Sequence, residues 1–170
     1  GVLHEFTSVS GVREDVTDVV LNLKAIQFIL HADEPKMLHL SVKGPAEVKA
    51  RDIQHDGTVR ILNPDAHIAT LNEEGPLEME LLLQKGRGSV PAEAGKAPDP
   101  TFVPVDAIHS PVRKVNYEVT ETRVGEATDF ERLKLEVWTN GAVTPQDALA
   151  SAAGLLESHL NLFRAITGPE

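Results

Sequence analysis

The middle of the chain is dominated by a short repeating pattern, in which apolar and polar residues alternate between turn-forming sequences. The alternation is clearest over residues 38–43, 77–84 and 115–120. A period of two is typical of a β-strand with one buried face. The breaks between these segments carry good turn chemistry: Gly44-Pro45, Asp56-Gly57, Asn63-Pro64-Asp65 and Gly75-Pro76. We therefore predict a β-rich region from about residue 25 to residue 124, with half-buried strands.

A short helix is predicted before this β-rich region. Ser10 is placed to act as its N-cap, and Lys24 near its end suits the negative end of a helix dipole. Its apolar residues repeat every 3.6 positions: Val12, Val16, Val19, Val20 and Leu23. Arg13, Glu14 and Asp18 are expected to face solvent.

A longer helix is predicted at the end of the chain, after one more strand (Leu133, Leu135 and Val137) that closes at Asn140-Gly141. Thr144 suits the N-cap, Pro145 the first helical position, and Asp147 the acidic position of a capping box. The apolar residues form two stripes: Leu149, Ala152, Ala153, Leu156, Leu160 and Phe163; and Ala148, Leu155 and Leu162. One stripe is enough to pack on a sheet, so the second predicts another partner, either a helix or a subunit.

The charge and composition of the chain disfavour several classes of function. The net charge is −10 and aromatic residues make up only 4%, which disfavours a nucleic-acid-binding surface. The longest basic run is the pair Arg113-Lys114. The chain has no cysteine, no apolar run near the about 20 residues that span a membrane, and no signal peptide over residues 1–10. We expect a cytoplasmic protein that binds protein partners or small ligands. We do not expect it to contact nucleic acid directly or to bind a membrane.

The search for catalytic motifs is negative. Gly95-Lys96 is not part of a phosphate-binding loop, and Gly86 and Gly88 are followed by Pro91 where a dinucleotide fingerprint has glycine. Neither a zinc-protease motif nor a nucleophile elbow is present. A metal site at His31 and His39, or acid–base chemistry at Glu78 and Glu80, is a weaker hypothesis than solvated surface residues. We expect no catalytic residue, no metal and no cofactor.

Three features have two interpretations each. Trp138 is either an interface anchor or a partly buried ring packed on the long helix. Arg113-Lys114 is a docking point for an acidic partner or, more simply, two cations at the end of a strand. The proline- and alanine-rich residues 91–100 indicate an exposed loop.

Several long segments together resemble the α subunit of bacterial DNA-directed RNA polymerase. They are VLHEF (2–6), GVREDV (11–16), VVLNLK (19–24), HIATL (67–71), KGRGSVPAE (85–93), VDAIHSPVRKVNYEVTETRVG (105–125), TDFERLKLEVWTNGAVTPQDAL (128–149) and HLNLF (159–163). They cover nearly the whole chain in the family's order. The resemblance implies an α+β fold with a β-rich insert domain, residues 1–111, whose start is expected to be truncated. Residues 112–170 would form the second half of an α/β dimerisation domain that ends in the long helix.

The resemblance implies a function in transcription as a non-catalytic scaffold subunit of a nucleotidyltransferase complex. Its partners would be a second α subunit and the large β and β′ subunits. The implied dimer residues are Leu149, Leu156, Leu160 and Phe163. The implied docking residues are Lys24 for β, Val105 and Val112 for β′, and Arg113 and Lys114 beside them.

The family's opening strands and helix, its linker and its carboxy-terminal domain have no counterpart in the sequence, which suggests a fragment. An activator-contacting acidic loop is not expected either, because residues 91–102 contain only Glu93 and Asp99 as acids. Two other functions remain open: a free-standing small-ligand-binding β domain, and a nucleic-acid-binding module that the charge disfavours.

Overall fold

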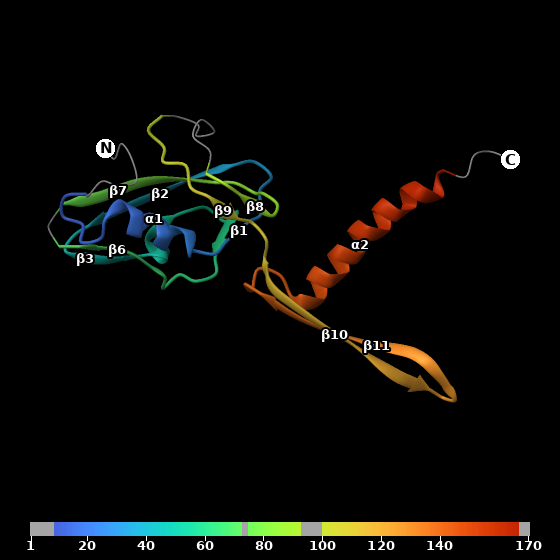
Figure 1. The fold of residues 1–170 in the computed structure, drawn as a ribbon. Coiled ribbons are helices and arrows are strands. Elements are labelled where there is room, and N and C mark those ends of the chain that lie inside the picture. The colour runs from blue at the N-terminus through green and yellow to red at the C-terminus, as the bar shows by residue number, and fades with distance from the viewer. Residues whose placement is uncertain (1–8, 73–74, 93–99, 167–170) are drawn as a thin grey trace. The chain divides into compact units, whose positions relative to one another are not determined.

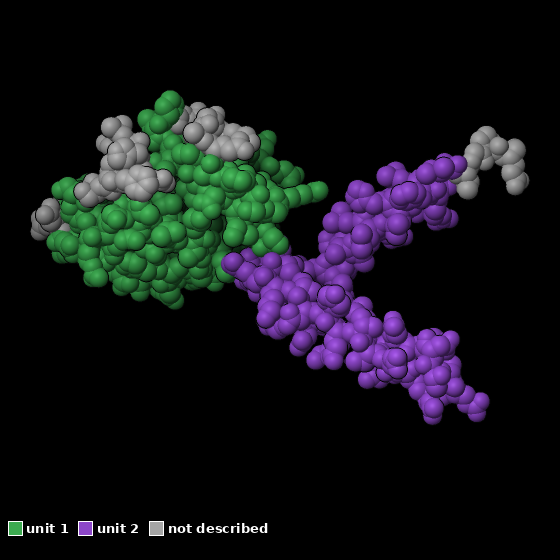
Figure 2. Space-filling view, viewed as in Figure 1, with its two compact units in different colours: residues 1–110 green, residues 111–170 purple. Residues whose placement is uncertain are grey.

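The structure is a computed structural model that describes residues 9–72, 75–92 and 100–166. The chain divides into two compact units, Gly1–Ser110 and Pro111–Glu170, which Figure 2 shows in different colours. Each unit is described by itself below. The combination of two helices with many strands gives the α+β class, which confirms the prediction.

The described residues of the first unit form one α-helix, a short 3₁₀ turn and nine strands. Figure 1 shows how these elements are arranged. Their bounds are α1 (Val16–Lys24), β1 (Phe28–Leu30), β2 (Lys36–Lys43), β3 (Ala46–Lys49), η1 (Ala50–Asp52), β4 (Ile53–Gln54), β5 (Val59–Ile61), β6 (His67–Leu71), β7 (Pro76–Leu83), β8 (Ser89–Val90) and β9 (Ala107–Ile108). The strand pairs among these described residues are antiparallel: β4-β2-β7, β3-β6, β1-β5 and β8-β9.

The core of the first unit lies between β2 and β7 on one side and β3 and β6 on the other, with α1 packed against it (Figure 1). Leu38 and Leu40 of β2 are almost fully buried, while His39 and Ser41 between them are exposed. β7 has the same alternation, with Leu77 buried and Glu78 and Glu80 exposed. The period-two pattern therefore predicted both strands and their inward faces correctly.

The first helix starts later than its apolar stripe predicted. Asp15, and not Ser10, is the N-cap, and its carboxylate accepts a hydrogen bond from the Asp18 N–H at 2.8 Å. Val12 forms a β-bridge with Leu71, so its backbone is extended. The Arg13 N–H donates to the Thr70 carbonyl at 2.9 Å. Because these backbone groups pair with the edge of β6, they are not available to a helix, and the prediction for Ser10 and Val12 was wrong. The end at Lys24 is as predicted.

Glu14 also differs from its prediction, because its side chain is only 15% exposed. Its carboxylate accepts hydrogen bonds from the Thr70 N–H at 2.7 Å, the Thr70 hydroxyl at 2.9 Å and His67 Nε2 at 2.9 Å. Burial acts to raise the pKa of Glu14, but the hydrogen bonds from Thr70 and His67 outweigh burial and lower the pKa from 4.5 to about 2. Glu14 thereby ties the segment before α1 to β6.

This lowered pKa predicts a pH-dependent loss of stability in Glu14→Gln. The ionised carboxylate stabilises the folded state above pH 4.5, and this contribution is lost as the pH falls toward 2. At pH 7, we expect Glu14→Gln to lower the free energy of unfolding by about 2–3 kcal/mol. Urea unfolding at pH 7, 5 and 3 should show the difference from the unsubstituted chain shrinking at pH 3. Glu78→Gln, at an exposed position of β7, is the control; an equal effect at both positions would contradict the account.

The second unit consists of a long hairpin and a helix: β10 (Val112–Val124), β11 (Ala127–Thr139) and α2 (Pro145–Arg164) (Figure 1). The helix begins where the sequence predicted. The Thr144 hydroxyl oxygen accepts a hydrogen bond from the Asp147 N–H at 3.1 Å, and Pro145 follows at the first helical position. The Thr144 hydroxyl also donates to the Asp147 carboxylate at 2.7 Å. Neither helix of the described residues is long and apolar enough to cross a membrane.

Candidate assembly surfaces

The long helix α2 exposes its apolar residues. Leu156, Leu160 and Phe163 are 65%, 63% and 69% exposed, and Leu149 is 50% exposed. No residue of α2 is buried in this chain. A helix that is apolar on more than one face needs a partner along its length. The four residues predicted for the dimer are therefore accessible to a second chain.

The β10–β11 hairpin has one apolar face, formed by three cross-strand pairs: Val115 with Val137, Tyr117 with Leu135, and Val119 with Leu133. The opposite face is polar, with Asn116 beside Glu136 and Glu118 beside Lys134. The sequence predicted strands with a buried face, but this face is uncovered in the chain, and Tyr117 is 74% exposed. The prediction of strand structure holds, and the prediction of burial does not.

The two units differ in whether their hydrophobic side chains are buried. Among the described residues, every buried hydrophobic side chain lies between Val16 and Leu77, in the first unit. The second unit has a hairpin face and a helix whose apolar residues remain in water. Since each large apolar side chain stabilises by about 1.5–3 kcal/mol when buried, the second unit gains little from packing within this chain. Its apolar surfaces are suited to binding other protein segments.

Lys24 is held by an ion pair that the sequence did not indicate. Its ammonium group lies 2.7 Å from the carboxylate of Asp106, which follows Val105 directly. This hydrogen bond from Lys24 lowers the pKa of Asp106. The structure thus joins the segment predicted to dock β to the segment predicted to dock β′, although the two residues are 82 positions apart in the sequence.

Two apolar residues near Asp106 in the sequence are also exposed. Val105 is 40% exposed, and Ile108 on β9 is 68% exposed. Sequence analysis did not select Ile108, because a strand of two residues is too short to show a periodic pattern. The loop predicted over residues 91–100 falls largely on residues 93–99, which lie outside the described residues.

The remaining docking residues lie at the start of the hairpin in the second unit. Val112 is half-buried, and Arg113 and Lys114 are exposed. The Lys114 ammonium group lies 5.0 Å from the centre of the Trp138 ring, within the range of a cation–π interaction. Trp138 is 43% exposed, which leaves part of the ring accessible.

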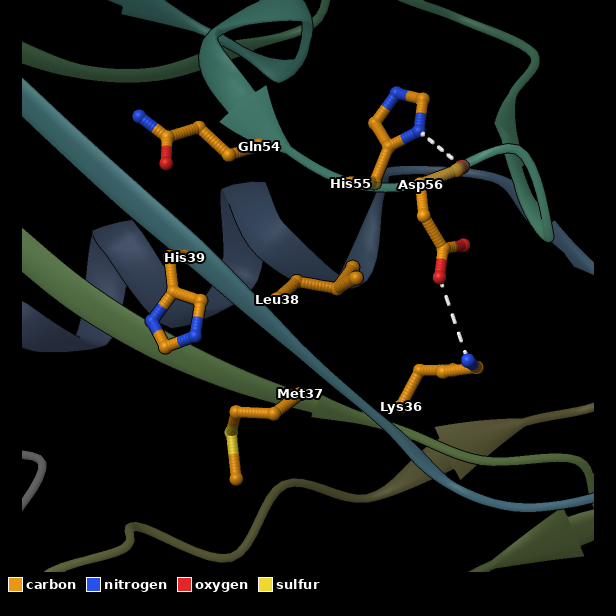
Figure 3. Close-up of a pocket in the computed structure, with 7 residues that line it drawn as sticks. All are labelled: Lys36, Met37, Leu38, His39, Gln54, His55 and Asp56. Carbon is orange, nitrogen blue, oxygen red and sulfur yellow. Dashed lines mark hydrogen bonds and ion pairs between the residues drawn. The ribbon is translucent and has the colours of Figure 1, made fainter.

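An open hollow of about 300 Å³ lies on the first unit. It is lined by Lys36, Met37, Leu38, His39, Gln54, His55 and Asp56 (Figure 3). Lys36 is paired with Asp56 at 3.3 Å, and the hydroxyl and N–H of Thr58 lower the pKa of Asp56 to about 2. The His55 ring contacts the Asp56 carbonyl and points away from His39, so the polar groups do not converge on one point (Figure 3).

The candidate metal and acid–base residues, His31, His39, Glu78 and Glu80, are all exposed. His39 lies 3.7 Å from Glu80 across the β2–β7 pair, and both side chains are more than half exposed. The described part of the chain contains no group of three or more histidine, cysteine, aspartate or glutamate side chains that could hold a metal ion. His39 and Glu80 therefore lie on solvated surface, and the polar groups around the hollow do not converge as those of a ligand site do.

The chain thus has an antiparallel β unit with a packed helix, followed by a hairpin and a helix that expose apolar residues. The family model of the RNA polymerase Rpb3/RpoA insert domain matches residues 1–110. The DNA-directed RNA polymerase subunit alpha of Symbiobacterium thermophilum is 53% identical over 169 residues, which is 98% of this chain and 54% of that protein. The same subunit of Desulfitobacterium hafniense is 50% identical over the same shares of the two chains. The chain belongs to the α subunit family of DNA-directed RNA polymerase, and it spans about half the length of these relatives.

Proposed function

We propose that this chain is a scaffold part of an RNA polymerase α subunit, which dimerises through α2 and docks the β and β′ subunits. The exposed apolar surface of the second unit is the observation that carries the proposal. A stable dimer needs a self-complementary patch, and the exposed leucines and the phenylalanine of α2 supply one. Assembly in the cytoplasm, where transcription takes place in bacteria, is part of the same proposal.

We assign residues 1–111 to the insert domain and residues 112–170 to the second half of the dimerisation domain. The boundary between the compact units, after Ser110, supports this assignment, as does the family model that ends at residue 110. The first unit contains a hydrophobic core of its own. In this proposal it acts as a pre-formed body that presents docking residues, while the second unit provides the dimer surface.

Catalysis is assigned to other subunits of the complex. Nucleotidyl transfer depends on metal ions held by clustered carboxylates. The residues that the structure describes bring no such cluster together. We therefore propose that the chain contributes to RNA synthesis only by holding the large subunits in place. A free-standing ligand-binding domain is not favoured, since the hollow beside β2 is open and its polar groups diverge.

Docking of β at Lys24 can be tested with a charge swap. In a full-length subunit carrying this sequence, we expect Lys24→Glu to weaken retention on β about tenfold, because it reverses a charge at the contact and repels Asp106. The double variant Lys24→Glu, Asp106→Lys restores an ion pair but keeps position 24 negative. Retention on immobilised β should remain low in the double variant if Lys24 contacts β directly. Unchanged retention in both variants would contradict the docking assignment.

A further inference from the structure

The turn at residues 85–88 carries a contact that the proposed docking surface does not explain. This turn, Lys85-Gly86-Arg87-Gly88, joins β7 to β8. Gly88 has a φ of +64°, in the left-handed region that favours glycine. Its carbonyl accepts a hydrogen bond from the His109 N–H at 2.7 Å. The pairing of Ser89 with Ile108 continues this contact into the β8–β9 pair.

Gly86 differs from Gly88, because its distinguishing feature is the close approach of the His109 ring. A Cβ atom added at Gly86 would lie closer to three atoms of that imidazole than van der Waals contact allows. Its φ is not in the left-handed region, so the need for glycine comes from space and not from backbone conformation. The imidazole therefore packs closely on the main chain at Gly86, and a methyl group at this position would displace the ring.

His109 thus holds the turn at two points, through its amide at Gly88 and through its ring at Gly86. It also follows β9 directly, so the same residue ends the segment that contains Val105 and Ile108. The other side of that segment is held by the ion pair between Asp106 and Lys24. The segment that carries the exposed side chains of Val105 and Ile108 therefore contacts the rest of the first unit at Asp106 and at His109.

We propose that His109, seated on Gly86, is a positioning residue that sets the orientation of residues 105–108 for binding the β′ subunit. This inference rests on the proposed function, which makes Val105 part of the β′ contact. His109 lies at the end of this segment and acts by holding it in place. The absence of a side chain at Gly86 leaves room for the His109 ring.

Gly86→Ala is expected to displace the His109 ring without unfolding the protein. The ring atoms that the new methyl group would meet are at the end of a side chain that can rotate, so the fold can accommodate the substitution. The contact between ring and turn is then lost, and residues 105–108 are held less firmly. We expect binding to β′ to fall about tenfold while the thermal unfolding midpoint stays close to that of the unsubstituted protein.

A double-mutant cycle in the full-length subunit tests this coupling, with affinity for purified β′ as the measurement. Gly86→Ala and His109→Ala remove the same contact, so each should weaken binding about tenfold and the double variant should be no weaker than either. Gly57→Ala is the control, because Gly57 has open space around it in the same unit. Additive effects in the double variant, or unchanged binding in both single variants, would overturn the inference.

Hydrogen exchange of the 170-residue chain separates the inference from the proposed function. The His109 amide, which donates to Gly88, should exchange faster in Gly86→Ala than in Gly57→Ala. Equal exchange in the two variants overturns the positioning role of the ring without reference to β′. Failure of the unsubstituted subunit to bind β′ overturns the proposed function, while binding that Gly86→Ala leaves intact overturns only the inference.

Discussion

A single substitution, Leu156→Asp, is expected to convert the full-length subunit from a dimer to a monomer. Leu156 is 65% exposed in this chain and lies in the apolar stripe of α2 that we assign to the dimer. In a dry interface the aspartate carboxylate would have no partner, and burying an unpaired charge is strongly unfavourable. The substitution therefore both removes a favourable contact and adds an unfavourable one.

The expected effect is large because a symmetric interface contains each substitution twice. Losing the burial of one leucine costs about 1.5–3 kcal/mol, so the two copies together cost about 3–6 kcal/mol before the carboxylate is counted. That corresponds to more than about a hundredfold in the dissociation constant of the dimer. Light scattering during size exclusion at micromolar concentration will give the mass directly.

Asn161→Asp is the matched control for this experiment. It introduces the same charge at an exposed position of the same helix, but on the polar face, away from both apolar stripes, given 3.6 residues per turn. The control should remain dimeric. If Leu156→Asp is also dimeric, α2 is not the dimer surface and packs only within the subunit.

Local signals in the sequence were sufficient for most of the regular structure. The alternation in residues 38–43 and 77–84 predicted β2 and β7 and the side chains that they bury. Thr144, Pro145 and Asp147 predicted the start of α2. In each case, the determining interactions lie within a few residues of each other, as capping bonds do, or repeat regularly along one element.

The sequence prediction failed where a distant part of the chain competes for the same backbone. Residues 11–13 have a helical apolar pattern, but β6 offers hydrogen bonds to their backbone, and the helix starts only after Asp15. The same local pattern placed Glu14 on the polar face of the helix, so its side chain was expected to face solvent. Its partners, His67 and Thr70, are 53 and 56 positions away.

The candidate surfaces were only partly predictable. The excess apolar residues of α2 indicated a missing partner, because the helix carries more apolar surface than one sheet can cover. The open face of the hairpin was not predicted, since alternation gives the apolar side of a strand but not whether anything covers it. The pairing of Lys24 with Asp106 and the contact of His109 with Gly86 depend on the fold, and no local pattern contains them.

RNA synthesis by separately purified subunits is the measurement that tests the scaffold assignment most directly. The full-length α subunit, the β subunit and the β′ subunit are assayed with template, nucleotides and Mg²⁺, alone and in combination. The account predicts no RNA from α alone, because it assigns nucleotidyl transfer to the other subunits. It predicts strong synthesis from the three together and little from β with β′. Mg²⁺-dependent RNA synthesis by α alone, or full activity of β and β′ without it, would contradict the account.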